Sequence, residues 1–404
     1  MPDLPSSPHR VVIAGGGVAG LEAMLALTAM AGPRVEVTLV SPDPSFRLRA
    51  LSVRQPFAQP GSRAWSLASA CEAHGARFVQ AAVLSVDTRE RVIRLSGGSR
   101  LEYDALFAAT GAVADAPFTG GLLFRGPQDV EAVHGLVQDV EGGWSTHVAF
   151  VVPGGTTWPL PLYELALMLA ERASSLCLDD LSLTIFTPEP SPLAVFGGEA
   201  SAAVADRLAA AGIDVRPATT VTGVAGRRVL DGAGQVLDEA QRVVVLGRLR
   251  GRALPGLPWD DEGFVPIDDH GRVTGADGVW AAGDGTTCPI KQGGVAAQLA
   301  EVAAADIARA AGADQPDRIF DPVLRAELLT GADSLFLRSG TGPERPEDAS
   351  LTAGHPLWWP PAKVVAPHVA AWLAHAELHD DPAERDVRVV HAEGDPLGGI
   401  ELLR

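Results

Sequence analysis

The chain has 404 residues, 47% of them hydrophobic, and it carries a formal net charge of −18. A chain of this length can bury more than one core, so we expect at least two domains. The acidic balance argues against nucleic acid as a partner, because phosphate binding needs a basic surface. The sequence has no apolar run of about 18 residues to span a bilayer and no apolar leader, so the expected location is the cytoplasm.

The first 40 residues predict a strand–helix–strand unit. The strand Val11–Ala14 leads into a helix from Val18 to Met30, and the β-branched run Val35–Val40 is the second strand. Such a unit is typical of a parallel sheet covered by helices. The elements expected next are a helix over 65–74, a meander with strands over 78–86 and 91–95, and a buried strand over 103–109.

A second set of alternating helices and strands begins near Phe124 and ends with the strand Arg242–Leu246. Its other expected strands cover 147–152, 181–186 and 213–215, and its helices cover 129–140, 162–172 and 199–211. A later helix is expected over 294–311. We interpret the two sets as related Rossmann-like units, which makes the fold α/β with a duplication.

A glycine-rich turn joins the first strand to the first helix. The run Gly15-Gly16-Gly17-Val18-Ala19-Gly20 fits the pattern G-x-G-x-x-G. The first glycine permits the tight turn, the second lets the backbone approach a pyrophosphate, and the third lets the helix pack on the strand. We therefore expect Gly15, Gly16, Gly17, Ala19 and Gly20 to bind a dinucleotide, the alternative being a glycine-rich turn without a ligand.

The second strand lacks the acid that usually holds the adenosine ribose at its end. It ends at Val40-Ser41, and the nearest acid is Asp43. Asp43 is the candidate ribose partner, and the alternative is a solvated turn residue between two prolines.

A second turn, far along the chain, identifies the dinucleotide. The run Ala281-Ala282-Gly283-Asp284 follows an apolar strand and precedes a helix. Asp284 can accept a hydrogen bond from a ribityl hydroxyl, and the positive end of the helix favours the negative charge of a reduced flavin. Only a flavin dinucleotide is long enough to use both turns, so the expected cofactor is FAD. Thr110-Gly111, at the end of another strand, is the third element of this site.

These motifs resemble the pyridine nucleotide–disulfide oxidoreductase superfamily. More closely, the chain is similar to its branch of sulfide:quinone oxidoreductases, flavocytochrome c sulfide dehydrogenases and type II NADH dehydrogenases. The matching segments are 15–20, 108–111, 281–284 and 289–300, and the resemblance spans about residues 10–310.

The resemblance implies an FAD-dependent oxidoreductase with two Rossmann-like domains, the first of them discontinuous. Residues 1–125 and 256–320 would form the FAD domain, 126–255 an NAD(P)-binding-like domain, and 321–404 a C-terminal lid, dimer contact or membrane contact. It implies further that Gly15, Gly17, Gly20, Thr110, Gly111, Gly283 and Asp284 hold FAD. Lys291 and Gln292 would lie beside the flavin ring, where a lysine would stabilise the reduced anion. The alternative for Lys291 is a solvated lysine at a helix cap.

The second unit departs from the pattern that binds NAD(P)H. Its turn, residues 151–161, keeps Gly154-Gly155 but has Trp158 and two prolines where phosphate should meet backbone N–H groups. Proline has no N–H to donate. NAD(P)H binding therefore stays open, with a retained structural domain as the other interpretation.

Cysteine and histidine spacing predicts neither a disulfide framework nor a metal site. The cysteines are Cys71, Cys177 and Cys288, with no C-x-x-C pair. Cys288 follows Asp284 closely but has no evident partner thiol, and the other two look like small core residues. Sulfide oxidation of the usual kind is therefore disfavoured.

The C-terminal run Trp358-Trp359-Pro360-Pro361 and the apolar stretch after it carry one lysine, Lys363, and no acid. Related proteins use such segments to reach a membrane and admit quinone, and a lid over the flavin or a homodimer contact is the alternative. The functional hypothesis is electron transfer from an unidentified donor to an acceptor such as a quinone. The alternatives are an NAD(P)H dehydrogenase and a non-catalytic accessory flavoprotein. Peripheral contact with the inner face of the membrane is compatible with the first of these.

Overall fold

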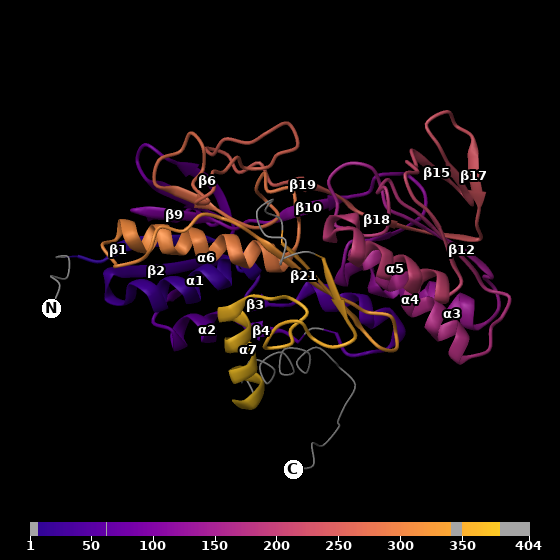
Figure 1. Ribbon diagram of the computed structural model, residues 1–404. Coiled ribbons are helices and arrows are strands. Elements are labelled where there is room, and N and C mark those ends of the chain that lie inside the picture. Colours follow the sequence, from indigo (N-terminus) through magenta and orange to yellow (C-terminus); the bar gives the residue numbers. More distant parts are fainter. Residues whose placement is uncertain (1–6, 62, 341–349, 380–404) are drawn as a thin grey trace, which may run out of the picture.

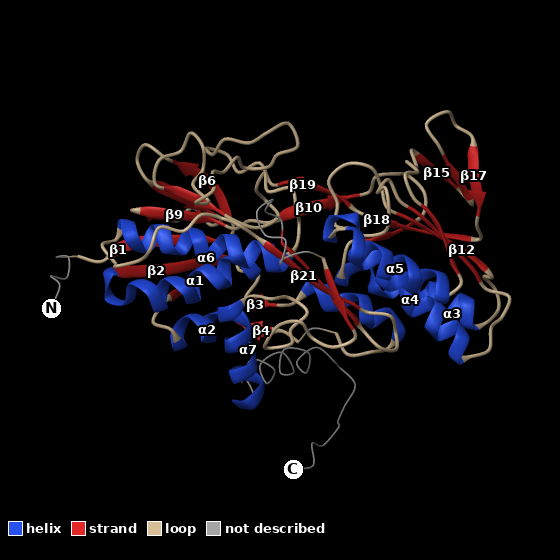
Figure 2. Ribbon diagram, viewed as in Figure 1, coloured by secondary structure: helices blue, strands red, loops and turns tan. Residues whose placement is uncertain are grey.

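The computed structural model describes residues 7–61, 63–340 and 350–379. Two five-stranded sheets, each with parallel strands only, lie side by side with helices packed on them (Figures 1 and 2). The expected class, α/β with two Rossmann-like units and a first unit that is discontinuous in sequence, is confirmed. No helix in these described ranges is long and apolar enough to cross a membrane.

The first sheet has the strand order β20-β9-β1-β2-β5. Its strands are β1 (His9–Ala14), β2 (Val35–Ser41), β5 (Arg77–Gln80), β9 (Ala105–Ala108) and β20 (Val279–Ala281). Helices α1 (Val18–Ala31) and α6 (Gly293–Ala310) cover one face, and the meander β6 (Val83–Asp87), β7 (Val92–Leu95) and β8 (Arg100–Glu102) covers the other. Val11 and Ile13 face the helices and Val12 faces the meander, because side chains alternate along a strand.

The second sheet repeats this plan with the order β11-β18-β12-β13-β14. Its strands are β11 (Leu122–Phe124), β12 (His147–Val151), β13 (Ser182–Phe186), β14 (Ile213–Arg216) and β18 (Arg242–Leu246). Helices α3 (Val130–Glu141), α4 (Leu160–Ser175) and α5 (Gly198–Ala210) cover one face, and β15 (Gly223–Ala225), β16 (Arg228–Leu230) and β17 (Val236–Glu239) cover the other. Phe150 faces the helices, and its neighbour Val151 faces the meander.

The chain crosses between the two units at an antiparallel pair. Strand β10 (Ala112–Asp115) leaves the first unit and pairs with β19 (Arg248–Gly251), which returns from the second. The remaining short elements belong to the two units and their connections. They are β3 (Ser45–Phe46), β4 (Trp65–Ser66), α2 (Leu67–Ala73) and four 3₁₀ turns, η1 (Gly32–Arg34), η2 (Arg49–Phe57), η3 (Pro127–Asp129) and η4 (Ala194–Phe196).

The C-terminal segment packs on both units. Strands β21 (Val323–Leu328), β22 (Leu335–Gly340) and β23 (Leu351–Ala353) form an antiparallel sheet whose inner leucines join the core of the second unit. Helix α7 (Pro367–His379) and the residues before it join the core of the first unit. Figure 1 shows this segment crossing from β21 to α7 beside α1.

Two expected elements differ from the structure. Trp65 and Ser66 form a strand, and helix α2 begins only at Leu67 because the Ser66 hydroxyl caps it by accepting the N–H of Ser69 at 3.1 Å. The expected strand over 78–86 is two strands, since β5 joins the parallel sheet and β6 starts the meander.

Candidate functional site

The first glycine-rich turn is shaped by close backbone contacts. Gly15 has φ +124°, and a Cβ there would lie 2.1 Å from the Ala109 carbonyl oxygen. A Cβ at Gly20 would lie 1.8 Å from the Gly15 carbonyl oxygen, so helix α1 can approach the strand only with glycine here. At Gly16 a Cβ would strike the Leu67 side chain at 2.4 Å. Backbone contacts therefore require glycine at Gly15 and Gly20, whereas Gly16 faces side chains only.

Gly17 is different, because a Cβ there would meet no atom of the described residues within 4 Å. Gly17 is the N-cap of α1 and provides no side-chain hydrogen bond to the helix. The first N–H groups of α1 therefore face an open edge, which is the arrangement that binds a phosphate. This geometry fits the pyrophosphate of FAD.

The other two expected elements lie at the same edge of the sheet. Strands β9 and β20 are neighbours, so Gly111 and Gly283, which follow them, come together. Both have positive φ, +67° and +88°. A Cβ at Gly283 would lie 3.3 Å from the Cβ of Ala19 in α1, which connects this turn to the first one. Parallel strands place such turns at one carboxyl edge, where a dinucleotide binds.

The Asp284 carboxylate is available to a ligand. It is partly exposed, and it forms no hydrogen bond or ion pair with any described residue. Burial raises the pKa of Asp284 above its usual range, and the positive charges of Lys291 and Arg49 oppose that rise. An unpaired carboxylate with nearby positive charge can accept a hydrogen bond from a hydroxyl such as a ribityl group.

Lys291 and Gln292 lie in the loop before α6 and are both buried. The Lys291 ammonium donates to the Thr286 carbonyl oxygen and lies 3.7 Å from the centre of the Phe264 ring. Burial lowers the pKa of Lys291, and Asp284 acts against this. The chain contains only two lysines, Lys291 and Lys363, and the structure buries both side chains. The rarity of lysine was visible in the sequence.

Gln292 caps helix α6 and connects it to the C-terminal sheet. Its Oε1 accepts the N–H of Val295 at 3.0 Å, and its Nε2 donates to the Arg325 carbonyl oxygen at 2.7 Å. Both ends of this amide are therefore engaged by the protein. Gln292 positions the helix terminus at which the flavin ring is expected.

Asp43 lies in the turn after β2, with an exposed side chain. Its Oδ1 accepts hydrogen bonds from the backbone N–H and the hydroxyl of Ser45, both at 2.9 Å. These bonds shape the turn. The residue at the strand end itself is Ser41, whose hydroxyl lies beside Gly16.

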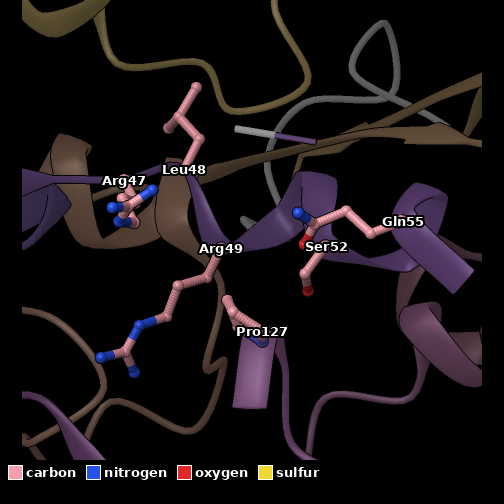
Figure 3. A pocket seen from close by; sticks show the side chains of 6 residues that line it. All are labelled: Arg47, Leu48, Arg49, Ser52, Gln55 and Pro127. Atoms are coloured by element: carbon pink, nitrogen blue, oxygen red, sulfur yellow. The ribbon is translucent and has the colours of Figure 1, made fainter. Parts of the chain in front are cut away.

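A small arginine-lined pocket adjoins this edge, and the sequence interpretation missed it. Its walls are Arg47, Leu48, Arg49, Ser52, Gln55 and Pro127, drawn in Figure 3. The signal was visible, because four arginines and no acid occur between Asp43 and Glu72 in an otherwise acidic chain. The charge of Arg49 acts on Asp284, so the pocket and the expected FAD site share one electrostatic environment.

The turn of the second unit, residues 152–159, is bonded to the chain that leaves this unit and to Glu262 of the first unit. Thr156 donates its hydroxyl to Glu262 at 3.0 Å, and its carbonyl oxygen accepts the N–H of Leu249 at 2.8 Å. Thr157 donates to the Gly247 carbonyl oxygen at 3.1 Å. Helix α4 then begins after Pro159, with another proline in its first turn. Because proline has no N–H group, these two prolines leave the start of α4 with fewer N–H donors than the start of α1.

An acidic residue that follows strand β13 is also occupied by hydrogen bonds within the protein. Glu189 there accepts hydrogen bonds from the buried Tyr163 hydroxyl at 2.7 Å and from Thr187 at 2.9 Å. Burial raises the pKa of Glu189. This is the position at which an acid would hold a ribose in a dinucleotide-binding unit, and here the protein itself uses the carboxylate.

The C-terminal segment covers the start of α6. A Cβ at Gly293 would lie 3.0 Å from Val364, and one at Gly294 would lie 3.4 Å from the Val365 carbonyl oxygen. Trp358 packs edge-on against Phe336 at 5.5 Å, and Trp359 is 88% exposed. The expectation that this segment flanks the flavin end of α6 is thus compatible with the geometry.

The three cysteines are free thiols in the structure, and none of them forms a disulfide. Cys288 is partly buried, and burial raises the pKa of its thiol. Cys71 lies in the core, as expected, but the same expectation was wrong for Cys177, which is exposed. Cys177 follows the end of α4 with φ +54°, outside the helical face that packs inward.

Known proteins are similar to this chain in sequence or in fold. The chain is 28% identical over 301 residues to the benzene 1,2-dioxygenase system ferredoxin–NAD(+) reductase subunit of Pseudomonas putida, covering 71% of this chain and 69% of that protein. Its structure is similar to the sulfide:quinone oxidoreductase of Aquifex aeolicus, with a TM-score of 0.74, 20% identity and coverage of 85% and 86%. The ferredoxin reductase for the CYP199A2 system of Rhodopseudomonas palustris gives a TM-score of 0.62, 20% identity and coverage of 83% for both chains.

A family description matches most of the chain. The pyridine nucleotide-disulphide oxidoreductase family matches residues 9–306, the part that contains both parallel sheets and most of α6. The motifs at Gly15 and Gly283 that predicted this family lie within the match. The chain therefore belongs to the pyridine nucleotide-disulphide oxidoreductase family and is an FAD-dependent oxidoreductase.

Proposed function

We propose that this enzyme passes electrons from a donor other than NAD(P)H to an apolar, quinone-like acceptor. The observation that carries the proposal is the contact of the Val364 side chain with Gly293 at the start of α6. An apolar cover at the flavin end suits an uncharged acceptor better than a soluble ion, because ions lose hydration there. The setting we propose is the cytoplasm, with contact at the inner face of the membrane where quinone is found.

The proposed cofactor site uses the carboxyl edge of the first sheet. Gly15, Gly16, Gly17, Ala19 and Gly20 would hold the pyrophosphate, Thr110 and Gly111 would flank it, and Gly283 with Asp284 would hold the ribityl chain. Asp43 remains the candidate for the adenosine ribose, with its free oxygen, since Oδ1 is used in the turn. FAD supplies two-electron chemistry, and these residues bind and orient it.

Lys291 is the proposed electrostatic residue of the flavin end. Its ammonium is buried beside Phe264 and Asp284, so its charge is weakly screened. We propose that this charge favours the reduced, anionic cofactor, while Gln292 fixes the helix terminus behind it. Both roles act by position and charge, without a covalent step.

Poor use of NAD(P)H is proposed from the second unit. The turn at Thr156 is tied to Glu262, and Glu189 is engaged by Tyr163. A nicotinamide dinucleotide would have to displace these bonds before its phosphates and ribose could be held. Each such bond contributes about 0.5–1.5 kcal/mol, so together they would weaken binding strongly.

Two alternatives have their own supporting observations. The likeness to a ferredoxin–NAD(+) reductase subunit favours electron flow from NAD(P)H to a protein acceptor. The engaged turn and the absence of a second thiol near Cys288 in sequence favour an accessory flavoprotein without a donor.

An anaerobic screen separates the three. The purified yellow protein is mixed with NADH, NADPH, sulfide and small organic donors, and flavin absorbance near 450 nm is followed. The reduced protein is then mixed with a short-chain ubiquinone analogue or with ferredoxin. Fast reoxidation by quinone and slow reduction by NAD(P)H support the proposal. Fast reduction by NAD(P)H followed by ferredoxin reduction supports the reductase alternative, and no donor at all supports the accessory role.

A further inference from the structure

Helix α7 is docked on the back of the FAD unit by a buried carboxylate. Glu22, in α1, is fully buried, and its two oxygens accept the backbone N–H groups of His368 at 2.9 Å and Val369 at 2.8 Å. These bonds join residues about 346 positions apart in the chain. A carboxylate at a helix N-terminus is a favourable cap, but here it is surrounded by the apolar core of α1, α6 and α7.

Two further metal-ligating side chains meet Glu22. The ligand atoms of Glu22, Glu301 and His368 all lie within 4.8 Å of one another. Glu301 comes from α6 and His368 from the first turn of α7, and both are partly buried. The three residues are therefore brought together from three helices that meet only through tertiary packing.

The Glu301 carboxylate lacks a hydrogen-bond partner on one of its oxygens. Its Oε1 is buried and has no hydrogen-bond partner. A buried carboxylate oxygen without a donor is costly, and two carboxylates side by side repel each other unless one of them keeps a proton. Within the described residues no lysine or arginine forms an ion pair with Glu22 or Glu301. A bound cation would satisfy the free oxygen and offset the repulsion together.

We infer that Glu22, Glu301 and His368 form a binding site for a divalent metal ion of the zinc type, which fastens α7 to α1 and α6. Two carboxylates and one imidazole are a ligand set that Zn²⁺ accepts, with water completing four-coordination. In a tetrahedral site, bonds of about 2.0–2.2 Å place neighbouring ligand atoms about 3.3–3.6 Å apart. The three ligand atoms lie within 4.8 Å of one another, so side-chain rotations would have to bring them closer to reach that geometry.

The site lies outside the expected flavin site and acts on structure. Helix α7 follows directly after Val364–Ala366, the residues that cover the start of α6. Fixing α7 therefore also fixes the apolar cover, whatever donor and acceptor the enzyme uses. The inference does not depend on the proposed function, and its test measures binding and stability instead of turnover.

The test uses the FAD-loaded full chain after treatment with a chelator. Zn²⁺ is titrated by isothermal calorimetry, metal content is measured after desalting, and thermal unfolding is compared with and without one equivalent of Zn²⁺. We expect one tight equivalent and a higher Tm for the wild type. Glu301→Gln and His368→Gln should each weaken this equivalent by ten-fold or more and lose the Tm shift.

Glu72→Gln, a change of an exposed acid on α2, is the matched control and should bind Zn²⁺ as the wild type does. Retained FAD shows that each variant is folded. Glu22→Gln is left as a secondary variant, because it also alters the cap of α7. The inference is overturned if the wild type binds no tight equivalent, or if Glu301→Gln and His368→Gln bind it unchanged. The same titration with Mg²⁺ should show no tight binding, since Mg²⁺ prefers oxygen ligands alone.

Discussion

Lys363, which directly precedes the apolar cover Val364–Ala366, forms a buried ion pair with Glu164 at the start of α4, 199 residues earlier in the chain. The Lys363 ammonium also donates to the Glu327 carbonyl oxygen at 2.8 Å, and Glu164 accepts the N–H of Leu329 at 3.0 Å. Side-chain exposure is 5% for Lys363 and 1% for Glu164. The pair therefore joins the C-terminal cover to the second Rossmann-like unit, while α7 joins it to the first.

Replacing Lys363 with Met should destabilise the protein by about 3–5 kcal/mol, because a buried carboxylate then loses its partner. Chemical unfolding measures this value. The double variant Lys363→Met/Glu164→Gln should recover part of the loss, since no unpaired charge remains. Equal losses in the single and double variants would show that the pair contributes only packing.

The loss in Lys363→Met should depend on pH. Burial raises the pKa of Glu164, and Lys363 opposes that rise, so removing Lys363 raises the pKa further. A carboxyl whose folded pKa is raised costs stability as pH rises above its unfolded pKa toward the folded one. The variant should therefore be closer to wild type at pH 5 than at pH 8. A loss that is the same at both pH values would contradict this charge-based reason.

Replacing Asp284 with Ala should weaken FAD retention by about 1–3 kcal/mol, the value of a hydrogen bond to a charged group. Equilibrium dialysis of the apoprotein with FAD measures the change. Asp261→Ala, a change of an exposed acid on a loop, is the control and should bind FAD normally. If Asp284→Ala binds FAD with wild-type affinity, this carboxylate does not bind the cofactor.

Replacing Lys291 with Met should make the flavin midpoint potential more negative. Loss of a buried positive charge costs the reduced anion about 1.4 kcal/mol, which corresponds to about 30 mV for two electrons. Spectroelectrochemistry on the FAD-loaded variant gives the potential directly. A shift of the opposite sign, or no shift, would contradict the electrostatic role and would leave Lys291 with the structural role of binding the Thr286 carbonyl oxygen.

Reduction of the flavin by NADH should not saturate at low micromolar concentration. The reason is the engaged turn, in which Thr156 is bound to Glu262 and Glu189 to Tyr163. Stopped-flow absorbance measures the concentration dependence. Tyr163→Phe removes one hydrogen bond to Glu189 and should leave the affinity for NADH unchanged or improve it. Saturation at low micromolar NADH in the wild type would refute the claim that the second unit is closed to NADH.

The sequence predicted the parts of this protein that depend on local patterns. Gly15, Gly20 and Gly283 could be read because a tight turn and a close backbone approach demand glycine whatever the surroundings. The alternation along β1 and β12 likewise follows from the two faces of a sheet. The helix limits of α1 and α6 agreed with the expected ones to within one residue.

Contacts between distant segments could not be predicted in this way. The pairing of Lys363 with Glu164 and the meeting of Glu22 with His368 depend on where the C-terminal segment folds back. No spacing in the sequence encodes that path. The hydrogen bond from Thr156 to Glu262 could not be predicted for the same reason. The prolines of the Thr156 turn, however, already indicated that this site differs from an NAD(P)H-binding turn.

The central claim is that the C-terminal cover directs an apolar acceptor to the flavin, and single-turnover reoxidation tests it most directly. The protein is photoreduced without oxygen and mixed with a short-chain ubiquinone analogue, with ferredoxin or with oxygen. Val364→Gln changes the cover where it meets Gly293, and Leu351→Gln, a change of an exposed residue of β23, is the control. We predict fast reoxidation by quinone in the wild type and control, at least ten-fold slower reoxidation in Val364→Gln, and unchanged FAD content in all three. Reoxidation by ferredoxin but not quinone, or a Val364→Gln variant as fast as the wild type, would contradict the claim.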